Sequence, residues 1–216
     1  MNTSYGLITT SELLKEKDPS GSYTFSGITQ KSFNSIKESS GEESALTELA
    51  SRIHHNLSLT ENIIEFIPKV NINHYRISSS LFSLLCDFSD DLQISLSDLP
   101  DKESIESKVR EIGFLARQHN VTLSICPDST NSLITEDEKS LSRATNELNF
   151  HSWFFEVAGF PSNASNPIII KPFGEPTSGS HENAVNSVKL FYKNFKKLNK
   201  ETQNRIVIQN ETDGFW

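Results

Sequence analysis

Ile168-Ile169-Ile170-Lys171-Pro172-Phe173-Gly174 is a run of three β-branched residues that stops at a charge and then turns. It is too short for a helix and has a proline on each side, so the pattern predicts a strand buried on both faces. Lys171 then lies at the carboxyl end of that strand. Ligands of α/β proteins bind at this end, because the loops that leave the strands converge there.

Two other segments have the same form, Val121-Thr122-Leu123-Ser124-Ile125-Cys126-Pro127 and Arg205-Ile206-Val207-Ile208-Gln209-Asn210-Glu211. Each is an apolar strand that ends in a polar or reactive side chain. If the three strands are neighbours in one parallel sheet, Cys126, Lys171 and Gln209 meet at one edge of it. That edge is the predicted functional site.

The length and composition indicate one globular protein of ordinary size. A chain of 216 residues suits a single domain, 1–216, in which we expect 1–40 to be an irregular strand and loop. The net charge of −8 argues against unspecific attraction to nucleic acid over the whole surface. Two cysteines and no leading apolar segment predict a reduced, cytoplasmic setting. The absence of a long apolar run predicts no membrane partner.

Hydrophobic periodicity gives the order of the elements. Strands are predicted at 4–9, 73–80, 121–127, 168–171 and 206–208, and helices at 42–66, 104–119, 135–159 and 181–198. In the last helix Val185 and Val188 are expected to point inward. Alternation of strands and helices predicts a parallel sheet with helical crossovers, hence an α/β barrel or an open doubly wound sheet. No glycine-rich phosphate-binding motif follows a strand, which disfavours a nucleotide-binding open sheet.

Several segments together resemble the UV-damage endonuclease family. Tyr75-Arg76-Ile77-Ser78-Ser79-Ser80-Leu81-Phe82 is similar to a family segment in which an aromatic residue and Arg precede two serines and a final Phe. Gly27-Ile28-Thr29 resembles a Gly-Ile-Thr-Thr segment of the family, and the matches keep their order as far as Glu211. The resemblance implies a metal-dependent TIM barrel that nicks DNA beside photolesions. The fold class expected for this chain is therefore α/β, an incomplete TIM-barrel-like parallel sheet with helical crossovers.

The metal-ligand positions implied by the resemblance carry other residues in this chain. Cys126 takes the place of the His in a His-Pro-Gly motif, Lys171 replaces a His at a strand end, and Gln209 replaces a Glu. Asp87 follows the second strand at a further ligand position. A protonated amine cannot coordinate a metal, and Gln is neutral, so no metal cofactor is expected. Asp87 and Cys126 are the only candidate ligands, and Mn or another divalent metal is the alternative if the protein is active.

The residues that read DNA damage in the family also differ. By resemblance, Ser129 and Thr130 stand where the family has a Gln and an aromatic residue that enter the duplex, and Leu7 stands in place of a Tyr used in the same way. Small hydroxyl groups cannot replace stacking on bases. The last strands of the family lie beyond Glu211, so the chain is expected to be divergent and to lack the final third.

Three functions remain open from the sequence. The preferred one is a binding or regulatory protein related to DNA repair, without metal-dependent cleavage, in which Lys171 replaces the charge of a lost cation. The alternatives are an active metal-dependent endonuclease that nicks DNA at UV photolesions, and a different enzyme with Cys126 as nucleophile.

The expected partners are damaged DNA and a second chain, or self-association, that completes the sheet, because five strands cannot close a barrel. Arg76 is expected to pair with Asp87 or Glu211. The residues expected to bind are Arg76, Ser79, Ser129, Thr130, Asn210 and Glu211.

Overall fold

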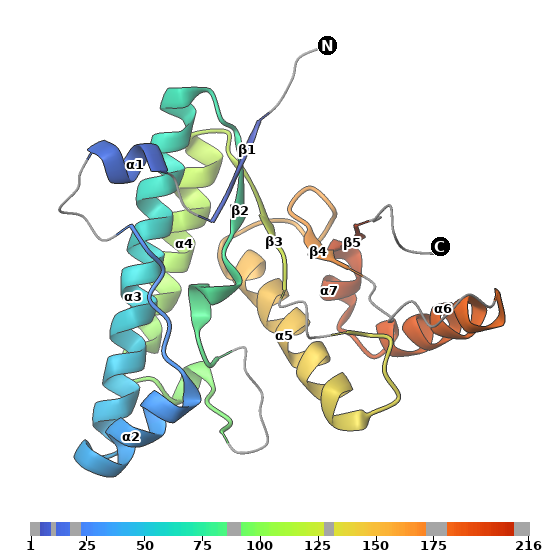
Figure 1. Ribbon diagram of the computed structural model, residues 1–216. Helices are drawn as coiled ribbons and strands as arrows, with labels where there is room; N and C mark the ends of the chain where they lie inside the picture. The colour runs from blue at the N-terminus through green and yellow to red at the C-terminus, as the bar shows by residue number, and fades with distance from the viewer. Residues whose placement is uncertain are drawn as a thin grey trace.

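The computed structural model describes residues 5–9, 12–17, 23–85, 92–127, 132–171 and 181–209. Strands and helices alternate along it (Figure 1). The strands are β1 Gly6–Ile8, β2 His74–Ile77, β3 Thr122–Ile125, β4 Ile168–Ile170 and β5 Ile206–Ile208. The α-helices are α1 Glu12–Lys17, α2 Gln30–Ser40, α3 Glu42–Phe66, α4 Lys102–Gln118, α5 Glu138–Val157, α6 His181–Phe195 and α7 Lys200–Arg205. The short 3-10 helices are η1 Ile67–Val70, η2 Ser79–Phe82 and η3 Leu96–Asp98.

The five strands form one sheet in the order β1-β2-β3-β4-β5, and every neighbouring pair is parallel. At least one α-helix connects each strand to the next, which confirms the expected α/β sheet with helical crossovers. Figure 1 shows α3 and α4 side by side to the left of the strands, α5 and α7 below β4 and β5, and α6 at the lower right. Within the described ranges β1 and β5 are the two edges, so these strands do not close a barrel.

Local signals explain where the helices begin and end. The Asp137 carboxylate accepts a hydrogen bond of 2.8 Å from the Ser140 amide and so caps α5, and bonds from Ser140 lower the pKa of this carboxyl. Asn120 has a φ of 55°, in the left-handed region, and follows the end of α4 as its sequence position predicts. Gly41, with a φ of 92°, separates α2 from α3 in a backbone conformation that other residues rarely adopt.

Three sequence expectations differ from the structure. Residues 1–40 were expected to be an irregular strand and loop, but they contain α1 and α2, and the Thr29 hydroxyl that precedes α2 accepts from the Ser32 amide. β4 is not buried on both faces: Ile168 is fully buried, but Ile169 is only half-buried. Val185 and Val188, expected to point inward, are exposed, whereas Phe191 and Phe195, also expected to point inward, pack against the core.

Alternate positions along the strands divide the sheet into two faces. Register pairs Tyr75 with Leu123 and Ile77 with Ile125, and all four side chains are buried in the core. The opposite face, called the open face below, is more polar: it carries His74, Arg76, Thr122 and Ser124, and of these four only Ser124 is buried. No helix within the described ranges is long and apolar enough to cross a membrane.

Candidate functional site

The strand register brings the predicted site residues to one face of the sheet. Arg76 pairs with Ser124, and Cys126 lies two residues after Ser124, so both project from the open face. Ile169 pairs with Val207, and Lys171 and Gln209 follow these residues by two. All four side chains, Arg76, Cys126, Lys171 and Gln209, therefore point to the same side near the carboxyl ends of β2 to β5.

A pocket of about 400 Å³ opens at this end of the sheet. Arg76, Ser79, Cys126 and Lys171 all line it, so the structure brings these four sequence-predicted residues together. The remaining lining residues come from the ends of β1 to β4 and from the turns that follow, and they are Ile8, Thr9, Ile77, Ser78, Pro127, Ile169 and Ile170. Side chains at strand ends are held by the sheet and presented to solvent, which is the usual arrangement of an α/β binding site.

Gln209 lies beside this pocket and not among its lining residues. The Gln209 amide donates a hydrogen bond of 2.9 Å to the Ile170 carbonyl, which continues the pairing of β5 with β4. Its side-chain Oε1 is buried and accepts no hydrogen bond within the described part of the chain. An amide oxygen of this kind can accept from a donor in a ligand.

The other sequence-predicted residues do not line this pocket. Leu7 pairs with Tyr75 and so projects from the helix-covered face of the sheet, away from the open face that carries Arg76. Five further residues lie outside the described ranges: Asp87, Ser129, Thr130, Asn210 and Glu211. The expected ion pair of Arg76 with Asp87 or Glu211 falls in the same ranges.

His74 is a further polar group of the open face that the sequence analysis did not single out. The Thr122 hydroxyl lies 3.3 Å from the Asn73 carbonyl, to which it donates, and 2.8 Å from His74 Nδ1. These contacts fit a neutral ring in which Nδ1 donates to the Thr122 hydroxyl and Nε2, 3.0 Å from Ser124 Oγ, accepts from it. Burial and then the nearby Arg76 charge lower the pKa of His74. A sequence signal for His74 does exist. Side chains alternate along a strand, so His74 lies on the same face of β2 as Arg76.

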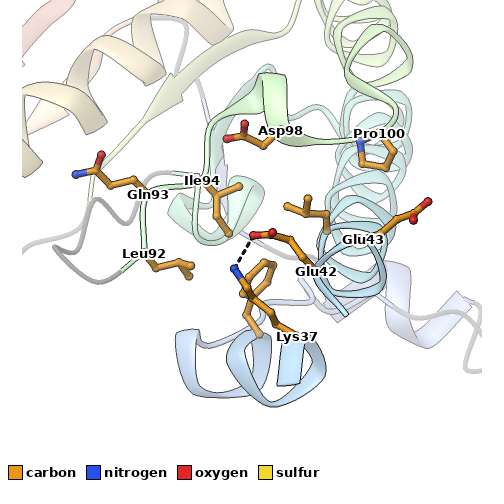
Figure 2. Close-up of a pocket in the computed structure, with 10 residues that line it drawn as sticks. Lys37, Glu42, Glu43, Leu92, Gln93, Ile94, Asp98 and Pro100 are labelled. Carbon is orange, nitrogen blue, oxygen red and sulfur yellow. Dashed lines mark hydrogen bonds and ion pairs between the residues drawn. The ribbon is translucent and has the colours of Figure 1, made fainter. Parts of the chain in front are cut away.

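A second pocket, of about 730 Å³, lies at the junction of α2, α3 and the residues around η3. Figure 2 shows Lys37 and Glu42 paired within this pocket and Glu43 pointing away. The Lys37 Nζ lies 2.6 Å from Glu42 Oε1. The Asp98 carboxylate accepts from the amide and the hydroxyl of Ser95, and these bonds lower its pKa. The pocket at the strand ends is the better candidate site because it brings together four residues singled out from the sequence, Arg76, Ser79, Cys126 and Lys171.

The donors in the pocket at the strand ends do not fit the divalent metals that the family resemblance implies. Its described lining includes two cations, Arg76 and Lys171, one thiol, Cys126, and no carboxylate or imidazole. Two positive charges repel a metal cation, and a single thiol supplies one ligand where several are needed. Across the described ranges no group of three or more His, Cys, Asp and Glu side chains could hold a metal ion.

Comparisons with known proteins agree with the resemblance drawn from the sequence. Residues 3–216 match the family model described as UV-endonuclease UvdE. A protein of Acanthamoeba polyphaga mimivirus that is named as a UV-damage endonuclease is 27% identical over 168 residues, which are 76% of this chain and 46% of that protein.

The crystal structure of SacUVDE superposes with a TM-score of 0.73 at 20% identity and covers 98% of this chain and 62% of that chain. This likeness shows that the fold is TIM-barrel-like. The chain spans about half the length of the mimivirus protein that it matches.

Proposed function

Because this chain belongs to the UV-endonuclease UvdE family, we propose that it is a UV-damage-endonuclease-like protein that binds DNA in a repair context without metal-dependent cleavage. The observation that carries this proposal is the pair Arg76 and Lys171 on the wall of the pocket at the strand ends. Cleavage of a phosphodiester by metal ions needs anionic or imidazole ligands at this place. Positive side chains instead attract the phosphate groups of DNA directly.

Purified protein is expected to contain no stoichiometric Mn or Zn and to produce no nicks in UV-irradiated duplex DNA with added Mn²⁺. The physical reason is the repulsion between a divalent cation and the two basic side chains. Elemental analysis and a supercoiled-plasmid nicking assay measure both properties, and a filter-binding assay compares irradiated with unirradiated duplex.

A variant that changes three strand-end residues provides the positive control. C126H/K171H/Q209E introduces the residue types that the family carries at these positions, and it should bind Mn²⁺ where the wild-type protein does not. Mn²⁺-dependent nicking by the wild-type protein would support the alternative, an active endonuclease. If the wild-type protein retains irradiated duplex no better than unirradiated duplex in the filter-binding assay, the proposed DNA-binding role is wrong.

We also propose that the protein acts as one domain and self-associates through the edge of its sheet. The buried core extends from Leu14 to Leu198. The edge strands β1 and β5 contain no charged residue, although charges or prolines normally protect such edges. Ile208 is 48% exposed on β5 and Ile8 is 59% exposed on β1. A second copy of the chain that pairs at β5 would cover this edge.

Light scattering coupled to size exclusion should therefore report a dimer that Ile208→Lys converts to a monomer, because a buried lysine at the edge opposes pairing. Phe114→Lys is the control, since Phe114 is an apolar residue on α4 that is exposed to a similar extent, at 57%. A wild-type monomer at every concentration would contradict self-association.

A further inference from the structure

Two cations, Arg76 and Lys171, lie on the wall of the small pocket at the strand ends. Arg76 is on β2 and Lys171 directly follows β4, and both side chains are half-buried. Partial burial lowers the effective dielectric around these charges, so they interact more strongly with an anion than surface charges do. The whole chain carries a net charge of −8, so the attraction is local to this pocket.

The same pocket offers neutral hydrogen-bond donors beside the two cations. The hydroxyl-bearing residues Thr9, Ser78 and Ser79 line it, and Ser79 is exposed. Guanidinium groups bind phosphate oxygens through two parallel hydrogen bonds, lysine binds them as a point charge, and serine hydroxyls can donate to the remaining oxygens. A volume of about 400 Å³ is at the small end of the range for ligand pockets and holds one phosphorylated sugar, not a segment of duplex.

We propose that this pocket is a phosphate monoester site in which Arg76 and Lys171 bind the phosphoryl dianion. The two positive side chains match a group with two negative charges better than they match the single charge of a backbone phosphodiester. The proposal rests on the proposed function, because it names the group that the same pocket binds. The dianion has two sources, the terminal phosphate of a DNA strand and a free mononucleotide.

Titration calorimetry with inorganic phosphate, and with sulfate as a dianion of constant charge, tests the site directly. R76Q and K171M should each weaken binding by about tenfold or more, since each removes a charge-assisted hydrogen bond. R76K keeps the charge and should recover part of the affinity, while K31M, at an exposed lysine of α2, should change it less than about twofold. Thermal unfolding of each variant checks that the fold is retained.

The His74 ring gives a second readout that a purely structural role of Arg76 would not move. Arg76 contributes to the lowered pKa of His74. A sulfate ion bound to Arg76 offsets that charge, so the NMR-detected pKa of His74 should rise on adding sulfate to the wild-type protein and stay constant in R76Q. The proposal would be overturned if the wild-type protein, R76Q and K171M showed the same sulfate affinity in calorimetry and the same change in the His74 pKa on adding sulfate.

A pair of oligonucleotides separates this proposal from the proposed function. A 5′-phosphorylated strand should bind at least about tenfold more tightly than the same strand without the terminal phosphate, and a mononucleotide should compete. Binding of DNA with no preference for the terminal phosphate would refute the monoester site and leave the DNA-binding role intact. Binding of phosphate and mononucleotide without binding of irradiated duplex would support the site and refute the DNA-binding role.

Discussion

Replacement of Gly113 by alanine is expected to lower the free energy of unfolding by about 3 kcal/mol or more, because there is no room for a methyl group at this position. A Cβ added to Gly113 would lie 1.8 Å from the Ala158 carbonyl oxygen and 2.6 Å from the carbonyl carbon. These are backbone atoms at the end of α5, and Ala158 is 1% exposed. The methyl group can be accommodated only if α4 and α5 move apart.

Gly113→Ala is expected to destabilise the protein although alanine has the higher helix propensity. Glycine inside a helix is ordinarily less stable than alanine by about 1 kcal/mol, so an alanine without steric conflict would stabilise α4. Denaturant unfolding of the Gly113→Ala variant measures the change, and Glu111→Ala, at an exposed position of the same helix, should stay within about 0.5 kcal/mol of the wild-type protein. A stable Gly113→Ala variant would mean that α4 and α5 do not touch at this point.

The contact at Gly113 also shows where sequence reasoning ends. Periodicity and end signals are local, so they predicted the strands, most of the helices and the stop at Asn120. The approach of Gly113 to Ala158 joins two helices through the tertiary fold, and no local pattern records it. The exposure of Val188 was missed for the same reason, because it too depends on tertiary contacts. An apolar stripe on a helix shows which face can be buried but not whether another element covers that face.

The candidate site could be predicted further than the packing. Because each strand ends in a polar group and the sheet is parallel, the sequence predicted that Cys126, Lys171 and Gln209 meet at one edge of it. Cys126 and Lys171 line one pocket there, whereas Gln209 lies beside that pocket. Alternation along β2 is enough to place His74 on the face of Arg76, but the contacts of its ring with the Thr122 and Ser124 hydroxyls depend on the register of β2 against β3. Strand register is set by tertiary packing, which a single sequence does not show directly.

Replacement of Asn56 by alanine should lower the free energy of unfolding by about 2–4 kcal/mol and loosen the turn that lines the pocket. Asn56 is fully buried in α3. Its Oδ1 accepts from the Ser26 amide at 2.7 Å, and its Nδ2 donates to the Ser26 carbonyl at 3.0 Å. The same Nδ2 donates to the carbonyls of Ser80 and Leu81 at 3.1 and 3.3 Å. One amide thus joins α3 to the Ser26 segment and to η2, and alanine would remove the partner of the buried Leu81 carbonyl and of the partly buried Ser26 backbone groups.

The η2 turn connects this stability effect to the pocket. Ser80 and Leu81 belong to η2, and the residues just before them, Ser78 and Ser79, line the pocket at the strand ends. Asn56→Ala should therefore accelerate amide hydrogen exchange at Leu81, whose N–H donates to the Ser78 carbonyl. Asn62→Ala makes the same substitution at an exposed position of α3 and should change neither property. If Asn56→Ala unfolds within about 0.5 kcal/mol of the wild-type protein, the Ser26 segment and η2 are held by other contacts and the pocket does not depend on this amide.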